Sequence, residues 1–183
     1  LDVGSLKDVE LRMLYHAYMI LTELVGGDVL NEVTFPPWIM AEAREAWMRN
    51  VRDDVKVSRS HKEIAAFIGE LGILCEVESL SDCGHFSVDM VLPDHDVAIE
   101  FDGPEHFISF SGSGEEGAAP GDASRASTKT PSTELRDKFL WRRYRTVVSV
   151  PWFEWAKLND KGAAEKKEYV AAKLRVAGVS VPA

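Results

Sequence analysis

Apolar residues recur every three or four positions in three stretches of the first 71 residues, the pattern of helices that bury one face. The predicted helices cover residues 6–25, 36–50 and 61–71. Ser58 or Ser60 can cap the third helix and Gly72 ends it, while His61 in its first turn is expected only to cap the helix or to be solvated. The pattern predicts a helical lobe over residues 1–57.

The pattern then changes to short apolar runs of strand character. Strands are predicted at residues 73–78, 86–92 and 97–102. If residues 93–96 form the loop between the last two strands, Leu92 pairs with Val97, and the continued register places Asp89 opposite Glu100. Asp102 lies two positions after Glu100 and therefore shares its face. Like charges at this spacing destabilise a sheet, so a metal ion, a basic side chain or water is expected to offset them.

The remaining elements complete an α/β domain over residues 58–183. A helix is predicted from Thr133, as N-cap, to about Arg143, followed by a strand over 144–150 and helices over 152–158 and 165–176. Residues 109–132 are rich in Gly, Ser, Ala, Pro and Thr, which predicts a flexible surface insertion. The predicted fold class is α/β, a small sheet flanked by helices.

Composition limits the function classes. The 183 residues are 45% apolar, enough for one core, and no apolar run approaches the ~18 residues that span a bilayer. The net charge of −9 is uneven, because residues 133–183 carry +5 and residues 1–132 carry −14. A basic C-terminal third is typical of a directional nucleic-acid face, although solvated basic helices look the same. Two cysteines predict a reduced compartment, and a start at Leu1 predicts a processed or partial product.

Several motifs in order resemble the RAP domain, an RNA-binding module. They are Ser87-Val88-Asp89, the run from Ala98 to Phe107 that contains Glu-Phe-Asp-Gly-Pro-Glu-His, the helix start at Thr133 and Arg136, and Val150-Pro151-Trp152-Phe153-Glu154-Trp155. The resemblance implies an endonuclease-like fold of the PD-(D/E)XK, very-short-patch-repair type. It also implies work on RNA in an organelle, with the mitochondrion favoured over the plastid, and a place in the mitochondrial ribosome on rRNA is one form of this.

One hypothesis is a metal-dependent endonuclease acting on RNA. Asp89 and Asp102, helped by Glu100, would hold Mg²⁺, and His106 would be the general acid or base. Nucleases of this fold usually carry a lysine where Asp102 stands, and Arg136 or Lys138 would have to replace it.

The favoured hypothesis is RNA binding without a cofactor, the carboxylates being inherited from a nuclease. The predicted phosphate-binding residues are Arg136, Lys138, Arg142, Arg143, Arg145 and Lys157. Trp152 and Trp155 are candidates for stacking on unpaired bases, with burial in the core as the alternative. A third hypothesis is a structural ribonucleoprotein subunit whose acidic helical lobe contacts neighbouring proteins.

Overall fold

The computed structural model describes residues 6–25, 35–53, 57–81, 84–108 and 128–181. The chain forms two compact units, which are described separately. The helical unit comprises Leu1–Lys56 and Leu80–Ser87, and the sheet unit comprises Val57–Ser79 and Val88–Ala183. The helical unit therefore also includes Leu80–Ser87, a segment that the sequence had placed in the α/β domain.

The helical unit is a pair of helices, α1 (Asp8–Val25) and α2 (Pro37–Asp53), that bury small and apolar side chains against each other. The Leu80–Ser87 segment is tied to both helices through His85. Its ring Nε2 lies 2.8 Å from the hydroxyl of Tyr15, and its carbonyl accepts a hydrogen bond of 2.8 Å from the indole of Trp47. Among the described helices, none combines the length and apolar character needed to cross a membrane.

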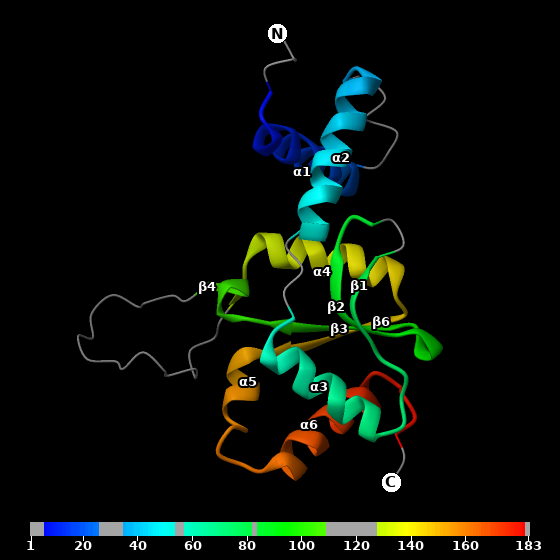
Figure 1. Cartoon of the computed structure of the whole chain (residues 1–183), viewed down its shortest axis with the longest axis vertical. Coiled ribbons are helices and arrows are strands. Elements are labelled where there is room, and N and C mark those ends of the chain that lie inside the picture. The colour runs from blue at the N-terminus through cyan, green and yellow to red at the C-terminus, as the bar shows by residue number, and fades with distance from the viewer. Residues whose placement is uncertain (1–5, 26–34, 54–56, 82–83, 109–127, 182–183) are drawn as a thin grey trace, which may run out of the picture. The chain divides into compact units, whose positions relative to one another are not determined.

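The sheet unit is built on a four-stranded mixed sheet of order β1-β2-β3-β6 (Figure 1). Its strands are β1 (Glu76–Leu80), β2 (Ser87–Leu92), β3 (Val97–Asp102) and β6 (Thr146–Pro151). Strands β2 and β3 are antiparallel with Leu92 opposite Val97, which confirms the predicted register, and the 3-10 turn η3 (Pro93–His95) joins them. Strand β6 pairs in parallel with β3, and a small ribbon of β4 (Phe107–Ile108) and β5 (Thr128–Lys129) lies outside the sheet.

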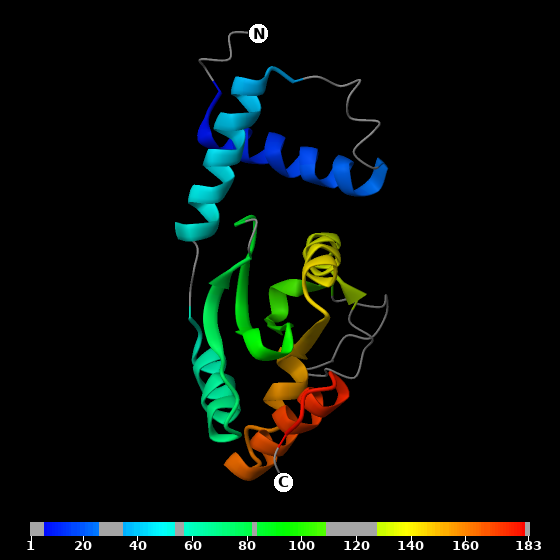
Figure 2. The same ribbon diagram turned by 90° about the vertical axis from the view of Figure 1, so that its right-hand side faces the viewer.

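Helices cover both faces of this sheet (Figures 1 and 2). On one face lie α3 (Arg59–Glu70), α5 (Trp152–Ala156) and α6 (Ala163–Val176), and on the other lies α4 (Pro131–Arg143). The larger core joins Ile64 and Ile68 of α3 to Met90, Ile99 and Leu174. The smaller core, under α4, consists of Val88, Val91, Ala98 and Leu140 with flanking apolar side chains. The fold is mixed α/β, as predicted.

Element ends differ from the predictions where a cap was misplaced. Ser58 caps α3, as expected, by accepting a hydrogen bond of 3.1 Å from the backbone of His61. Helix α4 begins at Pro131 because Thr130, and not Thr133, is its N-cap. The predicted insertion at 109–132 lies outside the described residues as far as 127, and its last five residues belong to β5, the cap and the first turn of α4.

Candidate functional site

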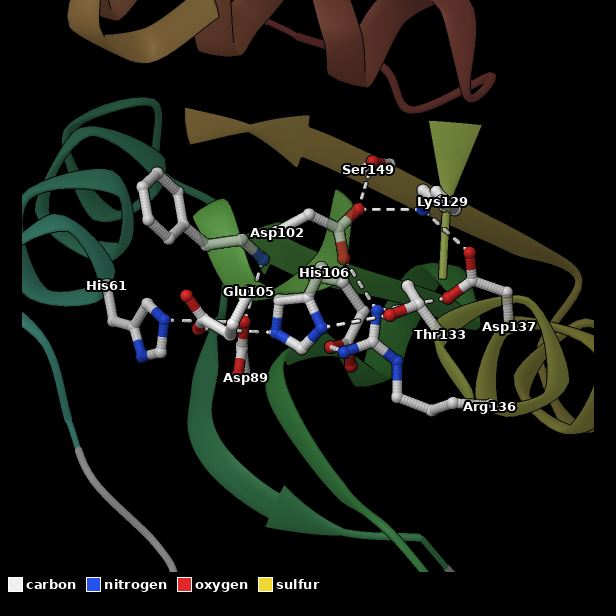
Figure 3. Close-up of polar contacts among 12 residues, drawn as sticks. His61, Asp89, Asp102, Glu105, His106, Lys129, Thr133, Arg136, Asp137 and Ser149 are labelled. Atoms are coloured by element: carbon white, nitrogen blue, oxygen red, sulfur yellow. Dashed lines mark hydrogen bonds and ion pairs between the residues drawn. The ribbon is translucent and has the colours of Figure 1, made fainter. Parts of the chain in front are cut away.

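Two carboxylates of β3 are buried under α4, in the part of the molecule that Figure 3 enlarges. Glu100 and Asp102 are spaced by two along the strand and therefore point to the same face. Asp102 is 0% exposed and Glu100 is 1% exposed. Burial of ionised carboxylates is costly unless other groups compensate their charge, so their neighbours decide what this site can do.

Asp102 is held by two cations and a hydroxyl (Figure 3). Its Oδ1 lies 2.7 Å from the guanidinium of Arg136, its Oδ2 lies 2.7 Å from Nζ of Lys129, and the hydroxyl of Ser149 donates to the same oxygen. Burial acts to raise the pKa of Asp102, but the hydrogen bonds from Lys129 and Ser149 and the charge of Arg136 outweigh it, and the pKa is lowered. Asp102 is therefore ionised at neutral pH.

Glu100 receives less compensation than Asp102. Arg136 contacts Oε2 of Glu100 at 3.0 Å, but it also contacts Asp137 at 3.0 Å, and Lys129 contacts Asp137 at 2.6 Å. Three carboxylates thus share two cations. Burial, opposed by Arg136 and reinforced by the neighbouring Asp89 and Asp102, raises the pKa of Glu100 well above its usual value. Its Oε1 is buried without a hydrogen-bond partner in the described part of the chain. The raised pKa indicates that the charge of Glu100 is less well compensated than that of Asp102, whose pKa is lowered.

Asp89 does not share the contacts of Glu100 and Asp102. The paired register ends at Met90 opposite Ile99, and Oδ2 of Asp89 accepts a hydrogen bond of 2.7 Å from the backbone N–H of Phe101. The same oxygen lies 3.3 Å from Nε2 of His61. Asp89 therefore has its own partners, Phe101 and His61 of α3, although its charge still acts on Glu100.

His61 joins two carboxylates, a role that its sequence position did not predict. Its Nδ1 lies 3.0 Å from Oε1 of Glu78, and its Nε2 faces Asp89 (Figure 3). Glu78 has a φ of 54°, a left-handed conformation that is costly for a non-glycine residue. In the described part of the chain, His61, Glu78 and Asp89 are the residues whose ligand atoms lie close enough, within 4.8 Å, to hold a metal ion. Both ring nitrogens already face carboxylates, so a metal would have to displace one contact.

The predicted Mg²⁺ site of Asp89 and Asp102 does not fit this arrangement. Mg²⁺ keeps several water ligands, whereas Asp102 is fully buried and its oxygens are taken by Arg136, Lys129 and Ser149. His106, the predicted acid or base, has its Nδ1 3.0 Å from the hydroxyl of Thr133 at the start of α4. Arg136 and Lys129 therefore supply the positive charge that a metal ion would give to the carboxylates of a nuclease.

A family model describes part of the sheet unit. The model of the RAP domain matches residues 99–173, from Ile99 in β3 to Lys173 in α6. The chain contains a RAP domain. No curated protein matches the chain closely enough to count as a relative. A RAP domain suggests RNA binding, and the matched residues include the whole of α4 and α5. The His61–Glu78–Asp89 group lies before the match.

Within the RAP domain, two of the cations predicted to bind RNA have internal roles. Arg136 belongs to the buried cluster, and the guanidinium of Arg145 donates to the carbonyls of His95 and Ala177, each at 3.3 Å. The others, Lys138, Arg142, Arg143 and Lys157, are exposed.

The tryptophans of the RAP domain differ in their exposure to solvent. Trp155 is 3% exposed, with Nζ of Lys166 5.0 Å from its ring centroid, so its ring is not available for stacking on a base. Trp152 is half-buried. Trp141, which the sequence analysis did not select, is 55% exposed on α4. The signal was its spacing of three from Lys138, which is also four positions before Arg142, because positions three or four apart are neighbours on a helix surface.

Proposed function

We propose that this chain binds RNA through its RAP domain and does not cleave it. The observation that carries the proposal is the buried cluster, in which Arg136 and Lys129 occupy the carboxylates that a nuclease would offer to a metal ion. Binding of this kind requires no cofactor, whereas cleavage by the alternative mechanism would require Mg²⁺.

The α4 surface, formed by Lys138, Trp141 and Arg142, is the first candidate for contact with RNA. All three side chains are exposed, and Lys138 lies three positions before Trp141 and four before Arg142, so it neighbours both on the helix surface. Lysine and arginine provide phosphate contacts that are independent of sequence, and an exposed tryptophan offers a stacking platform for an unpaired base. This combination supports single-stranded RNA as the ligand.

We further propose a place for the protein in mitochondrial RNA metabolism, with ribosomal RNA of the mitochondrial ribosome as the favoured partner and the plastid as the alternative compartment. The RAP match and the basic C-terminal third support this proposal. The helical unit would contact neighbouring proteins of the ribonucleoprotein. The carboxylates at positions 89, 100 and 102 support descent from an endonuclease-like fold of the very-short-patch-repair type. Sequencing of RNA cross-linked to the protein in fractionated cells tests the compartment and the partner.

The test of RNA binding uses labelled single-stranded RNA with and without Mg²⁺ or Mn²⁺, and scores retention and cleavage in the same samples. The variant Lys138→Glu/Arg142→Glu is compared with Lys62→Glu/Lys161→Glu, which changes the same net charge at exposed positions away from the α4 surface. We expect retention without cleavage, and for the α4 variant a shallower salt dependence, by about 0.7 in slope for each lost contact to a single strand.

Two results would overturn the proposal. The first is equal affinity and equal salt slope for the α4 variant and its control. The second is metal-dependent cleavage that Glu100→Gln abolishes, because this substitution removes a metal ligand without adding a charge.

A further inference from the structure

The sheet unit has a cleft on the face of the sheet opposite α4. It encloses about 570 Å³ and is lined by residues of α3, the end of β3, α5 and the start of α6. This volume lies within the ~300–1,000 Å³ that is typical of pockets for small ligands. Its lining includes Arg59, Glu63, Trp152, Trp155, Asn159 and Lys166.

The cleft lies beyond the carboxyl ends of two parallel strands. In the pairing of β3 with β6, Asp102 lies opposite Pro151, so the residues that follow each strand reach the same edge of the sheet. Pro104 follows β3, Trp152 follows β6, and both line the cleft. Ligands of open α/β sheets commonly bind at such an edge, because the chain that leaves neighbouring parallel strands forms a hollow there.

The two basic residues that line the cleft differ in whether an acidic residue neutralises them. Lys166 is neutralised by Glu63, since its Nζ lies 2.9 Å from one carboxylate oxygen and 3.0 Å from the other. Arg59 is exposed, and its side chain has no hydrogen-bond or ion-pair partner among the described residues. The cleft therefore holds one uncompensated positive charge, on Arg59, which would attract an anionic group.

The aromatic and polar groups of the cleft fit a nucleobase. The ring of Trp152 is half-buried and meets Phe153 edge-on, at an interplanar angle of 84° and a centroid distance of 6.1 Å. Among the described residues, no aromatic ring lies parallel to it, and Trp152 lines the cleft. Asn159 is exposed, and its side-chain amide, without a partner among the described residues, offers both a donor and an acceptor to a base edge.

We propose that this cleft binds one unpaired nucleotide, with its base stacked on Trp152, its base edge facing Asn159 and its phosphate on Arg59. The inference rests on the proposed RNA binding and assigns it a second contact site, on the sheet face opposite the α4 surface. Trp155 supports the cleft wall from within the core, and its partner Lys166 is held by Glu63. The nucleotide can belong to an RNA strand or be free, and the two sources share this chemistry.

The experiment measures binding of a 3′-labelled ten-nucleotide RNA and, separately, of adenosine monophosphate by quenching of tryptophan fluorescence. The variants are Trp152→Ala, Trp152→Phe and Arg59→Ala. Trp141→Ala reports on the α4 surface, and the control is Lys62→Ala, an exposed lysine on the same helix as Arg59. Arg59→Ala changes an exposed side chain that has no hydrogen-bond or ion-pair partner among the described residues, so it remains informative if Trp152→Ala fails to fold.

We expect Trp152→Ala to weaken RNA binding about tenfold and Trp152→Phe to restore most of it, since stacking on one base has this magnitude. Arg59→Ala is expected to weaken binding about threefold and to reduce the salt slope by about 0.7, while Lys62→Ala changes neither. Suppose that the α4 variants weaken RNA binding while Trp152→Ala and Arg59→Ala stay within twofold of wild type. This result would overturn the cleft as a binding site and leave the proposed function standing. Binding of the mononucleotide without RNA would leave the cleft and overturn the proposed function. Binding of neither would overturn both.

Discussion

The contacts in the buried cluster predict different losses of stability for Asp102→Asn and Glu100→Gln, although each replaces a carboxylate with an amide. Asp102→Asn keeps the side-chain shape but removes a charge that faces Arg136 and Lys129, each at 2.7 Å. Removal of one partner from a buried ion pair costs about 3–5 kcal/mol, because the other charge is left uncompensated. Both cations retain Asp137, and their side chains are 16% and 23% exposed, so we expect about 2–3 kcal/mol.

Glu100→Gln is expected to cost less than Asp102→Asn, because the raised pKa of Glu100 indicates that its charge is less well compensated in the folded state. For a protein of this size, the Asp102→Asn loss corresponds to a fall in Tm of roughly 4–12 °C. Urea denaturation at pH 7, followed by circular dichroism, measures both variants, and an unchanged m-value confirms that only stability has changed. If Glu100→Gln is as destabilising as Asp102→Asn, the charge of Glu100 is as well compensated as that of Asp102 and the reasoning is wrong.

The raised pKa of Glu100 and the left-handed backbone of Glu78 each lead to a further prediction. The raised pKa of Glu100 stabilises the fold fully below the unfolded value of ~4.3, and this contribution is lost as the pH rises towards the folded value. The Tm of the wild type relative to Glu100→Gln should therefore fall as the pH rises above ~4.3, and a constant difference would contradict the raised pKa. At position 78, where φ is 54°, Glu78→Gly should be more stable than Glu78→Ala by about 1 kcal/mol in urea denaturation, although both lose the contact with His61. The usual order, with alanine more stable, would show that the left-handed backbone is relaxed at little cost.

The sequence was sufficient where a local signal decides the structure. The four-residue loop set Leu92 opposite Val97, and a serine before an apolar run gave the cap of α3. It was insufficient where the partners come from distant elements. Arg136 looked like an RNA-binding arginine because Asp102 lies 34 positions away, and nothing local shows that α4 packs over that carboxylate.

The same limitation applies to Trp155 and to Asp89. The burial of Trp155 depends on Phe67 and Tyr169, which lie on α3 and α6 and come together only in the folded unit. The position of Asp89 depends on His61 and on the end of regular pairing after Met90. The register predicts which residue lies opposite Asp89, but not that His61 of a distant helix contacts its carboxylate.

The β4–β5 ribbon has a practical consequence for engineering. Phe107 pairs with Lys129, and Ile108 with Thr128, so the two ends of the segment 109–127 are adjacent. The free energy of closing such a loop rises only with the logarithm of its length, by about 0.6 kcal/mol for each doubling. A fluorescent protein or an affinity module whose own termini are close can therefore be inserted between these two strands with little loss of stability. The junction must leave Lys129 in place, because this residue compensates the buried charge of Asp102.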